Sequence, residues 1–179
     1  SGPQETVEFF SRVHGVPLDK LLADLEAAKE APAATYREDL FKKASLKVPD
    51  TWEELYTVGK ELKKMGNPVG IPISQNYDSI STAGPVLWCF GGMEVDKDGK
   101  TVRINSPAAA QAIEWYRKMY KDCMEPEVLS WTDASNNESM QQDKAGWIHN
   151  PVSAYIVARN MKLPSADGST RSSRPTMSS

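Results

Sequence analysis

The sequence lacks a long apolar run and a strong excess of either charge. No stretch approaches the roughly 20 apolar residues that a membrane-spanning helix needs. The chain begins SGPQETVEFF, without the basic start and apolar block of a secretory signal. Its formal net charge is −3 over 179 residues, the wrong sign for a protein that neutralises many phosphates. We therefore expect no nucleic-acid partner, no membrane insertion, and a chain that is mature, cytosolic or cut from a longer one.

Cysteine and histidine are also scarce. Cys89 and Cys123 are the only cysteines, too few for a structural zinc site, which takes four ligands. They form either one disulfide or, as we favour, two buried free thiols. Cysteine usage therefore does not decide between an oxidising and a reducing compartment. The two histidines, His14 and His149, lie far apart in unrelated contexts.

Catalytic motifs are missing too. The sequence contains no HExxH, GxSxG, P-loop or GxGxxG pattern. Glu138 and Asp133 could be paired as glycosidase carboxylates, but with 24 acidic residues such a pair arises easily by chance. We predict that the chain is not an enzyme and uses no metal or cofactor.

The clearest local structure lies between Lys47 and Ser74. Asp50 is a good helix N-cap, with Glu53 placed to close a capping box. Gly66 predicts that the helix ends there, in a residue with left-handed backbone conformation. Residues 69–74 predict a short buried strand. The helix between them carries one apolar stripe, made of Trp52, Leu55, Val58, Leu62 and Met65.

Helical and extended patterns alternate along the rest of the chain. Residues 79–90 predict a helix that starts or is interrupted near Gly84-Pro85, and residues 94–104 predict a β-hairpin. Ser106-Pro107 is a strong helix start, and Asp133 or Ser135 caps a further predicted helix over 133–143. The first of these two helices is expected to bury Ala109, Ile113, Tyr116 and Tyr120 or their close neighbours.

The chain ends differ from its middle. Residues 1–34 read as a polar helical segment. A strand ending at His149 and a short helix over 152–160 precede the Ser-rich residues 161–179, which we expect to be disordered. Few strands separated by helices predict an α/β fold, with helices layered on a small mixed sheet.

Three segments, in this order, resemble one protein family. They are TYREDLFKKASLKVPDTWEELYTVGKELKKMG (35–66), LWCFGGMEVDKDGKTVRINSPAAAQAIEWYRKMY (87–120) and MQQDKAGWIHNPVSAYI (140–156). The chain is similar to the extracellular solute-binding proteins of carbohydrate ABC importers, which include the maltose-binding protein. The resemblance implies a type II periplasmic-binding-protein-like C-terminal lobe over residues 35–160, without the first lobe, preceded by the unmatched residues 1–34.

The same resemblance implies a function and a cellular location. It implies non-catalytic binding of a sugar or related small solute, delivery to ABC transporter permease subunits, and a periplasmic or surface-anchored extracellular location. Val152 stands where the family often has a tryptophan that stacks on sugar. The alternative that the residues leave open is a structural or protein-interaction α/β module without a solute site.

A sugar site needs aromatic planes for ring faces and fixed polar groups for hydroxyls. Tyr77 follows the predicted strand at its carboxyl end, where open α/β sheets bind ligands, and the resemblance also implies an aromatic contact there. Trp131 is a candidate stacking face. The polar candidates, each with a turn, cap or packing role as its alternative, are Gln75, Asn76, Asp78, Asp133, His149 and Asn150.

The tryptophans divide into two groups. Trp147 and His149 share one face of the predicted strand and Ile148 takes the other. Trp147 is therefore either a ligand contact or a core residue. Trp52, Trp88 and Trp115 lie on helix stripes and are assigned to the core.

Overall fold

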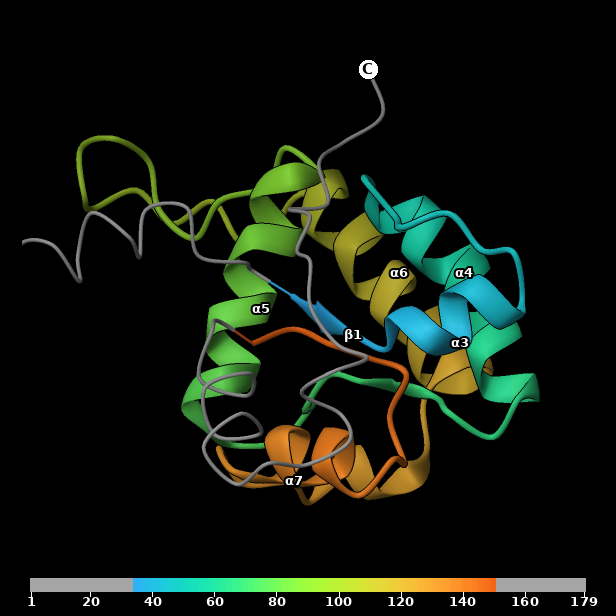
Figure 1. Ribbon diagram of the computed structural model, residues 1–179. Coiled ribbons are helices and arrows are strands. Elements are labelled where there is room, and N and C mark those ends of the chain that lie inside the picture. The colour runs from blue at the N-terminus through green and yellow to red at the C-terminus, as the bar shows by residue number, and fades with distance from the viewer. Residues whose placement is uncertain (1–33, 151–179) are drawn as a thin grey trace, which may run out of the picture. The chain divides into compact units, whose positions relative to one another are not determined.

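The structure, a computed structural model, describes residues 34–150. The predictions for residues 1–33 and for the helix and tail after Asn150 lie outside the described residues. Within that range, no helix has both the length and the apolar character needed to cross a bilayer. The described residues form an α/β fold, as predicted, in which helices lie around a small sheet (Figure 1).

The sheet is mixed and has three short strands in the described range. β1 (Thr35–Tyr36) pairs antiparallel with β3 (Trp147–Ile148), and β2 (Val69–Gly70) pairs parallel with β3 on its other side. The strand predicted over 69–74 is therefore too long. The chain leaves the sheet after Gly70, and the Ile73 N–H bonds the Val128 carbonyl instead, at 2.9 Å.

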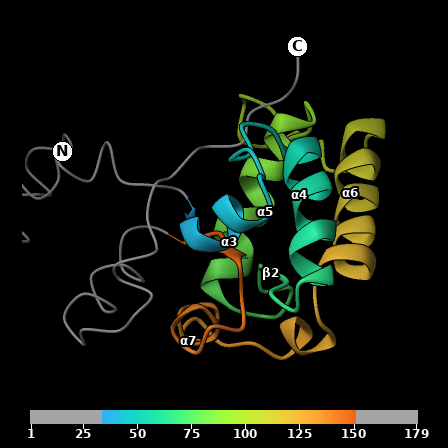
Figure 2. The same cartoon turned by 45° about the vertical axis from the view of Figure 1, so that its right-hand side comes forward.

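Helices pack on both faces of this sheet. α4 packs along α6, as two views show, and also contacts β2, while α7 contacts β2 and β3 (Figures 1 and 2). Alternation along β3 sends Trp147 into the main core and Ile148 into a smaller cluster with Met140 and Ala145, as predicted. The helical elements are α3 (Glu38–Lys43), α4 (Trp52–Lys64), α5 (Tyr77–Cys89), α6 (Pro107–Cys123), the 3₁₀ turn η1 (Pro126–Leu129) and α7 (Ser135–Gln141).

The start of α4 is capped one residue later than predicted. Thr51, not Asp50, is the N-cap: its hydroxyl accepts from the Glu54 N–H at 3.1 Å, and the Glu54 carboxylate accepts from the Thr51 N–H at 3.2 Å. The capping box is present but shifted by one position. The end is as predicted, because Gly66 has a φ of 84°.

Thr51→Ala is expected to destabilise the fold by about 1 kcal/mol, because the Glu54 N–H loses its cap. The matched control is Asp50→Ala, whose exposed carboxylate pairs with Lys47 at 3.1 Å and is expected to contribute less than about 1 kcal/mol. Equilibrium unfolding in urea measures both. A larger loss in Asp50→Ala would contradict the shifted cap.

Two other helix starts also differ from the prediction. α5 begins at Tyr77, because the Asn76 side chain caps it by accepting from the Ser79 N–H at 2.8 Å, and it runs to Cys89 with Pro85 inside it. α7 begins at Ser135 after Ala134, and no side chain caps it, so the predicted caps at Asp133 and Ser135 are wrong. The predicted hairpin over 94–104 is present in a short form: Val95 and Val102 form an antiparallel bridge, and the Asp96 and Arg103 N–H groups donate to the Thr101 and Glu94 carbonyls at 2.8 and 2.9 Å.

The buried face of α6 is rotated from the predicted one. Ile113 is 69% exposed, while Trp115 is buried and donates its indole N–H to the Trp52 carbonyl at 3.1 Å. The large ring takes the inner position and turns Ile113 outward. Trp52 and Trp115 are core residues as assigned, but Trp88 is 58% exposed and donates to Glu94, so its assignment to the core is wrong.

Both cysteines are free. Cys123 is buried between α4 and α6, where burial raises the pKa of its thiol to about 12. Cys89 is half-buried. The favoured prediction of two free thiols is confirmed, although only one of them is fully buried.

Candidate functional site

The parallel strands β2 and β3 end at the same edge of the sheet. After β2 the chain runs through Ser74 to the first turn of α5, and after β3 it reaches His149 and Asn150. The segment before α7 approaches from a third side, because the Trp131 carbonyl accepts from Asn76 at 2.8 Å. Carboxyl ends of parallel strands are where open α/β sheets bind ligands. We name the polar residues at this edge the strand-end cluster: Gln75, Asn76, Tyr77, Asp78, Asp133, Asn136, Asn137 and Asn150.

Asn76 holds two of these segments together. Its side-chain oxygen caps α5, and its amide nitrogen donates to the Trp131 carbonyl at 2.8 Å and the Ser74 hydroxyl at 3.0 Å. Both ends of the amide are therefore used within the fold. Gln75, the preceding residue, is exposed.

Tyr77, a member of the cluster, and Ile80 expose large side chains at the start of α5. The Tyr77 side chain is 73% exposed and Ile80, one turn further along α5, is 70% exposed. Tyr77 stands at the first position of α5 rather than in the loop that the sequence predicts. A tyrosine ring with an exposed face is a surface on which the C–H face of a sugar can pack.

A chain of hydrogen bonds joins Asp78, Asn136 and Asn150. Asn136 is completely buried, donates to Asp78 Oδ2 at 2.8 Å and accepts from Asn150 Nδ2 at 3.3 Å. Asn150 also donates to Asn137 Oδ1 at 2.8 Å. These contacts link the start of α5, the body of α7 and the end of β3, which are remote in sequence.

Asp133 meets Asp78 at the start of α5. Its Oδ1 accepts from the Asp78 backbone N–H at 3.2 Å. Burial raises the pKa of the Asp78 carboxyl, the hydrogen bond from Asn136 opposes that rise, and the charge of Asp133 adds to it. The cluster thus holds two neighbouring carboxylates.

His149 is half-buried, and its ring bonds the body of α5. Its Nδ1 is 2.8 Å from the hydroxyl of Thr82, a fully buried residue of α5. Because that hydroxyl donates to the Asp78 carbonyl at 3.0 Å, it accepts from His149, which fixes the Nδ1–H tautomer. Burial lowers the pKa of His149 to about 4, so the ring is neutral at pH 7.

Trp147 is part of the core. It is completely buried, and its ring stacks on His149 with centroids 6.2 Å apart. Of the two roles that the sequence leaves open for it, the structure shows core packing, and its ring offers no face to a ligand at the surface.

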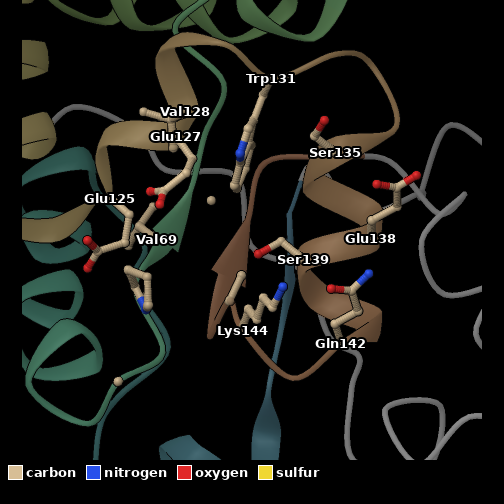
Figure 3. Close-up of a pocket in the computed structure, with 14 residues that line it drawn as sticks. Val69, Glu125, Glu127, Val128, Trp131, Ser135, Glu138, Ser139, Gln142 and Lys144 are labelled. Carbon is tan, nitrogen blue, oxygen red and sulfur yellow. The ribbon is translucent and has the colours of Figure 1, made fainter.

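Trp131 lines a groove to which Tyr77 does not contribute. Its ring lines a groove of about 500 Å³ between η1, β2 and α7, and in Figure 3 it points into the space between η1 and α7. A methyl group on Gly70 would lie 3.2 Å from this ring and 2.9 Å from the Ile148 side chain, so the ring packs over Gly70 on the sheet face that carries Ile148. Tyr77 does not line the groove. Stacking of a ligand on Trp131 would therefore use a surface separate from the strand-end cluster.

The sequence points to most of the strand-end cluster but not to its buried centre. Its pattern places Asn136 within a helix and assigns it no further role. A signal is present, because asparagine is a poor helix former and two of them stand in succession inside this predicted helix. No three His, Cys, Asp or Glu side chains gather into a metal-binding group within residues 34–150.

Comparison with known proteins places these residues in a family. The sequence profile described as "Bacterial extracellular solute-binding protein" matches residues 13–170. A protein of Brucella abortus (strain 2308) that carries the name of a binding protein is 29% identical over 149 residues, which are 81% of this chain and 35% of the relative. A Brucella suis biovar 1 (strain 1330) relative matches equally. The chain therefore spans about a third of the length of these relatives.

Solved structures show the same fold. Maltose-bound MalE3 of T. maritima superposes with a TM-score of 0.74 at 22% identity, over 82% of this chain and 39% of that one. An ABC transporter solute-binding protein of Agrobacterium radiobacter K84, solved with ribitol, gives a TM-score of 0.72 at 22% identity, over 82% and 38%. One from Thermotoga lettingae TMO, bound to α-D-tagatose, gives 0.72 at 17% identity, over 83% and 40%.

Proposed function

The chain belongs to the bacterial extracellular solute-binding proteins, and from this premise we propose that it binds a sugar or related polyhydroxylated solute without chemical change. The solute is then delivered to the membrane permease subunits of an ABC transporter, in the periplasm or at the outer cell surface. The described residues act as one lobe of a two-lobed receptor. The extent of the matches, 37–40% of the similar solved chains, supports this division.

The observation that carries the proposal is the strand-end cluster. The first turn of α5 carries an exposed tyrosine, Tyr77, followed in the chain by Asp78, whose carboxylate is fixed by the buried Asn136. Sugars offer C–H groups on their faces and hydroxyls at their edges, so an aromatic plane and oriented acceptors suit them. Oδ1 of Asp78 is the carboxylate oxygen that Asn136 leaves available.

Binding of this kind works through a population shift. The ligand contacts one lobe in the open state and both lobes in the closed state, so it favours closure by the difference between the two sets of contacts. The strand-end cluster supplies the contacts of one lobe. No step in this mechanism needs a nucleophile or a general base.

Tyr77→Ala is expected to weaken sugar binding about tenfold or more without lowering stability, because the side chain is 73% exposed and a stacking contact contributes on the order of 1 kcal/mol beyond burial. Maltose, ribitol, D-mannitol and D-tagatose, which are bound in similar solved structures, form the panel for calorimetric titration. Ile113→Ala on α6, also largely exposed, is the matched control.

The same experiment separates the proposal from its alternative. Equal affinities in Tyr77→Ala and Ile113→Ala would remove Tyr77 from the site. An intact protein that is stabilised by no sugar in a broad thermal-shift screen would favour the structural or protein-interaction module instead.

A further inference from the structure

Side chains of the protein accept hydrogen bonds from two backbone N–H groups in the first turn of α5. The Ser79 N–H is bonded by Asn76 Oδ1 at 2.8 Å and the Asp78 N–H by Asp133 Oδ1 at 3.2 Å. Free N–H groups at a helix start normally favour anions. Here two of them are already occupied by side chains, one of which is itself an anion.

Among the described residues, the segments that form the cluster carry acidic side chains and no basic ones that are charged at pH 7. The segments that form it, 71–78, 131–137 and 149–150, contain no lysine or arginine. His149 is neutral at pH 7, because burial lowers its pKa to about 4. Within residues 34–150, the charge that acts on the Asp78 carboxylate is that of Asp133, which repels it.

A hydrogen bond from Asn136 holds the Asp78 carboxylate in one orientation. Asn136 is completely buried and uses its amide nitrogen on Asp78 Oδ2 and its oxygen on Asn150 and the Asn137 N–H, at 2.8, 3.3 and 2.7 Å. A buried, fully bonded amide is costly to displace. The Asp78 carboxylate is therefore a fixed acceptor for a hydroxyl or amine proton and a fixed repulsive charge for an anion.

We propose that the Asp78–Asp133 pair, in which Asn136 fixes the Asp78 carboxylate and the Asp78 N–H bonds Asp133, restricts the site to neutral or amine-bearing sugars and excludes acidic sugars such as uronates and sugar phosphates. This inference rests on the proposed function, since it names the ligand class of the same site. Two unit charges a few ångströms apart near a protein surface interact strongly enough to change affinity about tenfold or more. Binding of an acidic sugar is also expected to improve with salt, which screens the repulsion.

The test compares ligands that differ in one group. Glucose, galactose and mannose are titrated into the intact protein at pH 7 and low salt, each beside its uronate and its 2-amino form. We expect the neutral and amino forms to bind and the uronate to bind at least about tenfold more weakly. Asp133→Asn keeps an acceptor for the Asp78 N–H but removes a charge, so it should reduce the difference in affinity between a neutral sugar and its uronate. The control, Glu114→Gln on the surface of α6, should leave that difference unchanged.

The outcomes are distinguishable. A uronate that binds as tightly as the neutral sugar, with affinities unmoved by Asp133→Asn, would overturn the charge restriction and leave sugar binding intact. If neither the three series nor the panel of maltose, ribitol, D-mannitol and D-tagatose contains a sugar that binds, the proposed function fails and the restriction fails with it. Asp133 is exposed, so its substitution is expected to leave the fold stable enough for the comparison.

Discussion

Trp147→Ala is expected to destabilise the protein by about 3–5 kcal/mol. The side chain is completely buried in the main core and stacks on His149. Truncating it removes a large apolar surface and leaves a cavity beside the central strand of the sheet. Equilibrium unfolding in guanidinium, followed by far-UV circular dichroism, measures the loss.

Two variants make this result specific. Trp147→Phe should cost much less than Trp147→Ala, because it keeps a ring and removes an indole N–H that is buried without a hydrogen-bond partner among the described residues. Trp88→Ala, at a tryptophan that is 58% exposed, should cost no more than about 1 kcal/mol. If Trp147→Ala instead lowered sugar affinity while stability stayed unchanged, Trp147 would be a ligand contact after all.

Acidification from pH 7 to pH 4 is expected to cost about 3 kcal/mol of stability through His149 alone. The pKa of the folded state is about 4, against about 6.5 in the unfolded chain. Between these two pH values the imidazole of His149 is protonated in the unfolded chain and neutral in the folded protein. The contribution of neutral His149 to the free energy of unfolding is therefore complete above about pH 6.5, and it is lost as the pH falls toward 4.

His149→Gln isolates this contribution. Glutamine does not titrate in this range, and its amide can still donate toward the Thr82 hydroxyl that His149 contacts at 2.8 Å. The variant shares every other titrating group with the parent, including Asp78, whose raised pKa acts in the opposite direction. Unfolding free energies at pH 7 and pH 4 are compared in both proteins. Parallel losses would show that His149 is not buried neutral.

Patterns within a few residues predict much of the fold. The apolar stripe of α4, the Gly66 helix end, the Ser106 cap and the split between Trp147 and Ile148 are all readable, and all are confirmed. Such features depend on local geometry, namely the 3.6-residue period of a helix or the two-residue period of a strand. The predicted α4 cap is wrong by one position because Asp50 and Thr51 are both good caps, each followed three residues later by a glutamate.

Packing against distant partners is not readable in the same way. Trp88 and Trp115 both lie on helices, yet one is exposed and the other buried. The difference is decided by what each helix packs against: α6 packs along α4, and Trp115 meets Trp52 there, with ring centroids 5.2 Å apart. The sequence period places a residue on a face but does not say which face is covered.

The candidate site shows the same division. Sequence pattern and family resemblance select Tyr77, Asp78, Asp133 and Asn150 because they follow strands or begin helices, and their contact with a ligand stays a prediction. Trp131 is grouped with them by the sequence, but its ring lines another groove. Only the folded chain shows which side chains share a surface.

By itself the sequence determined the class of fold, the family, and the absence of any familiar catalytic motif, because these depend on short patterns and on composition. Tertiary structure decided that Asn136, 58 residues from Asp78 and 14 from Asn150, bonds both of them. The physical reason is that parallel pairing of β2 with β3 brings their carboxyl ends to one edge, and α7 then inserts a buried amide between the two loops. Hydrogen bonds across such distances leave no periodic trace in the sequence.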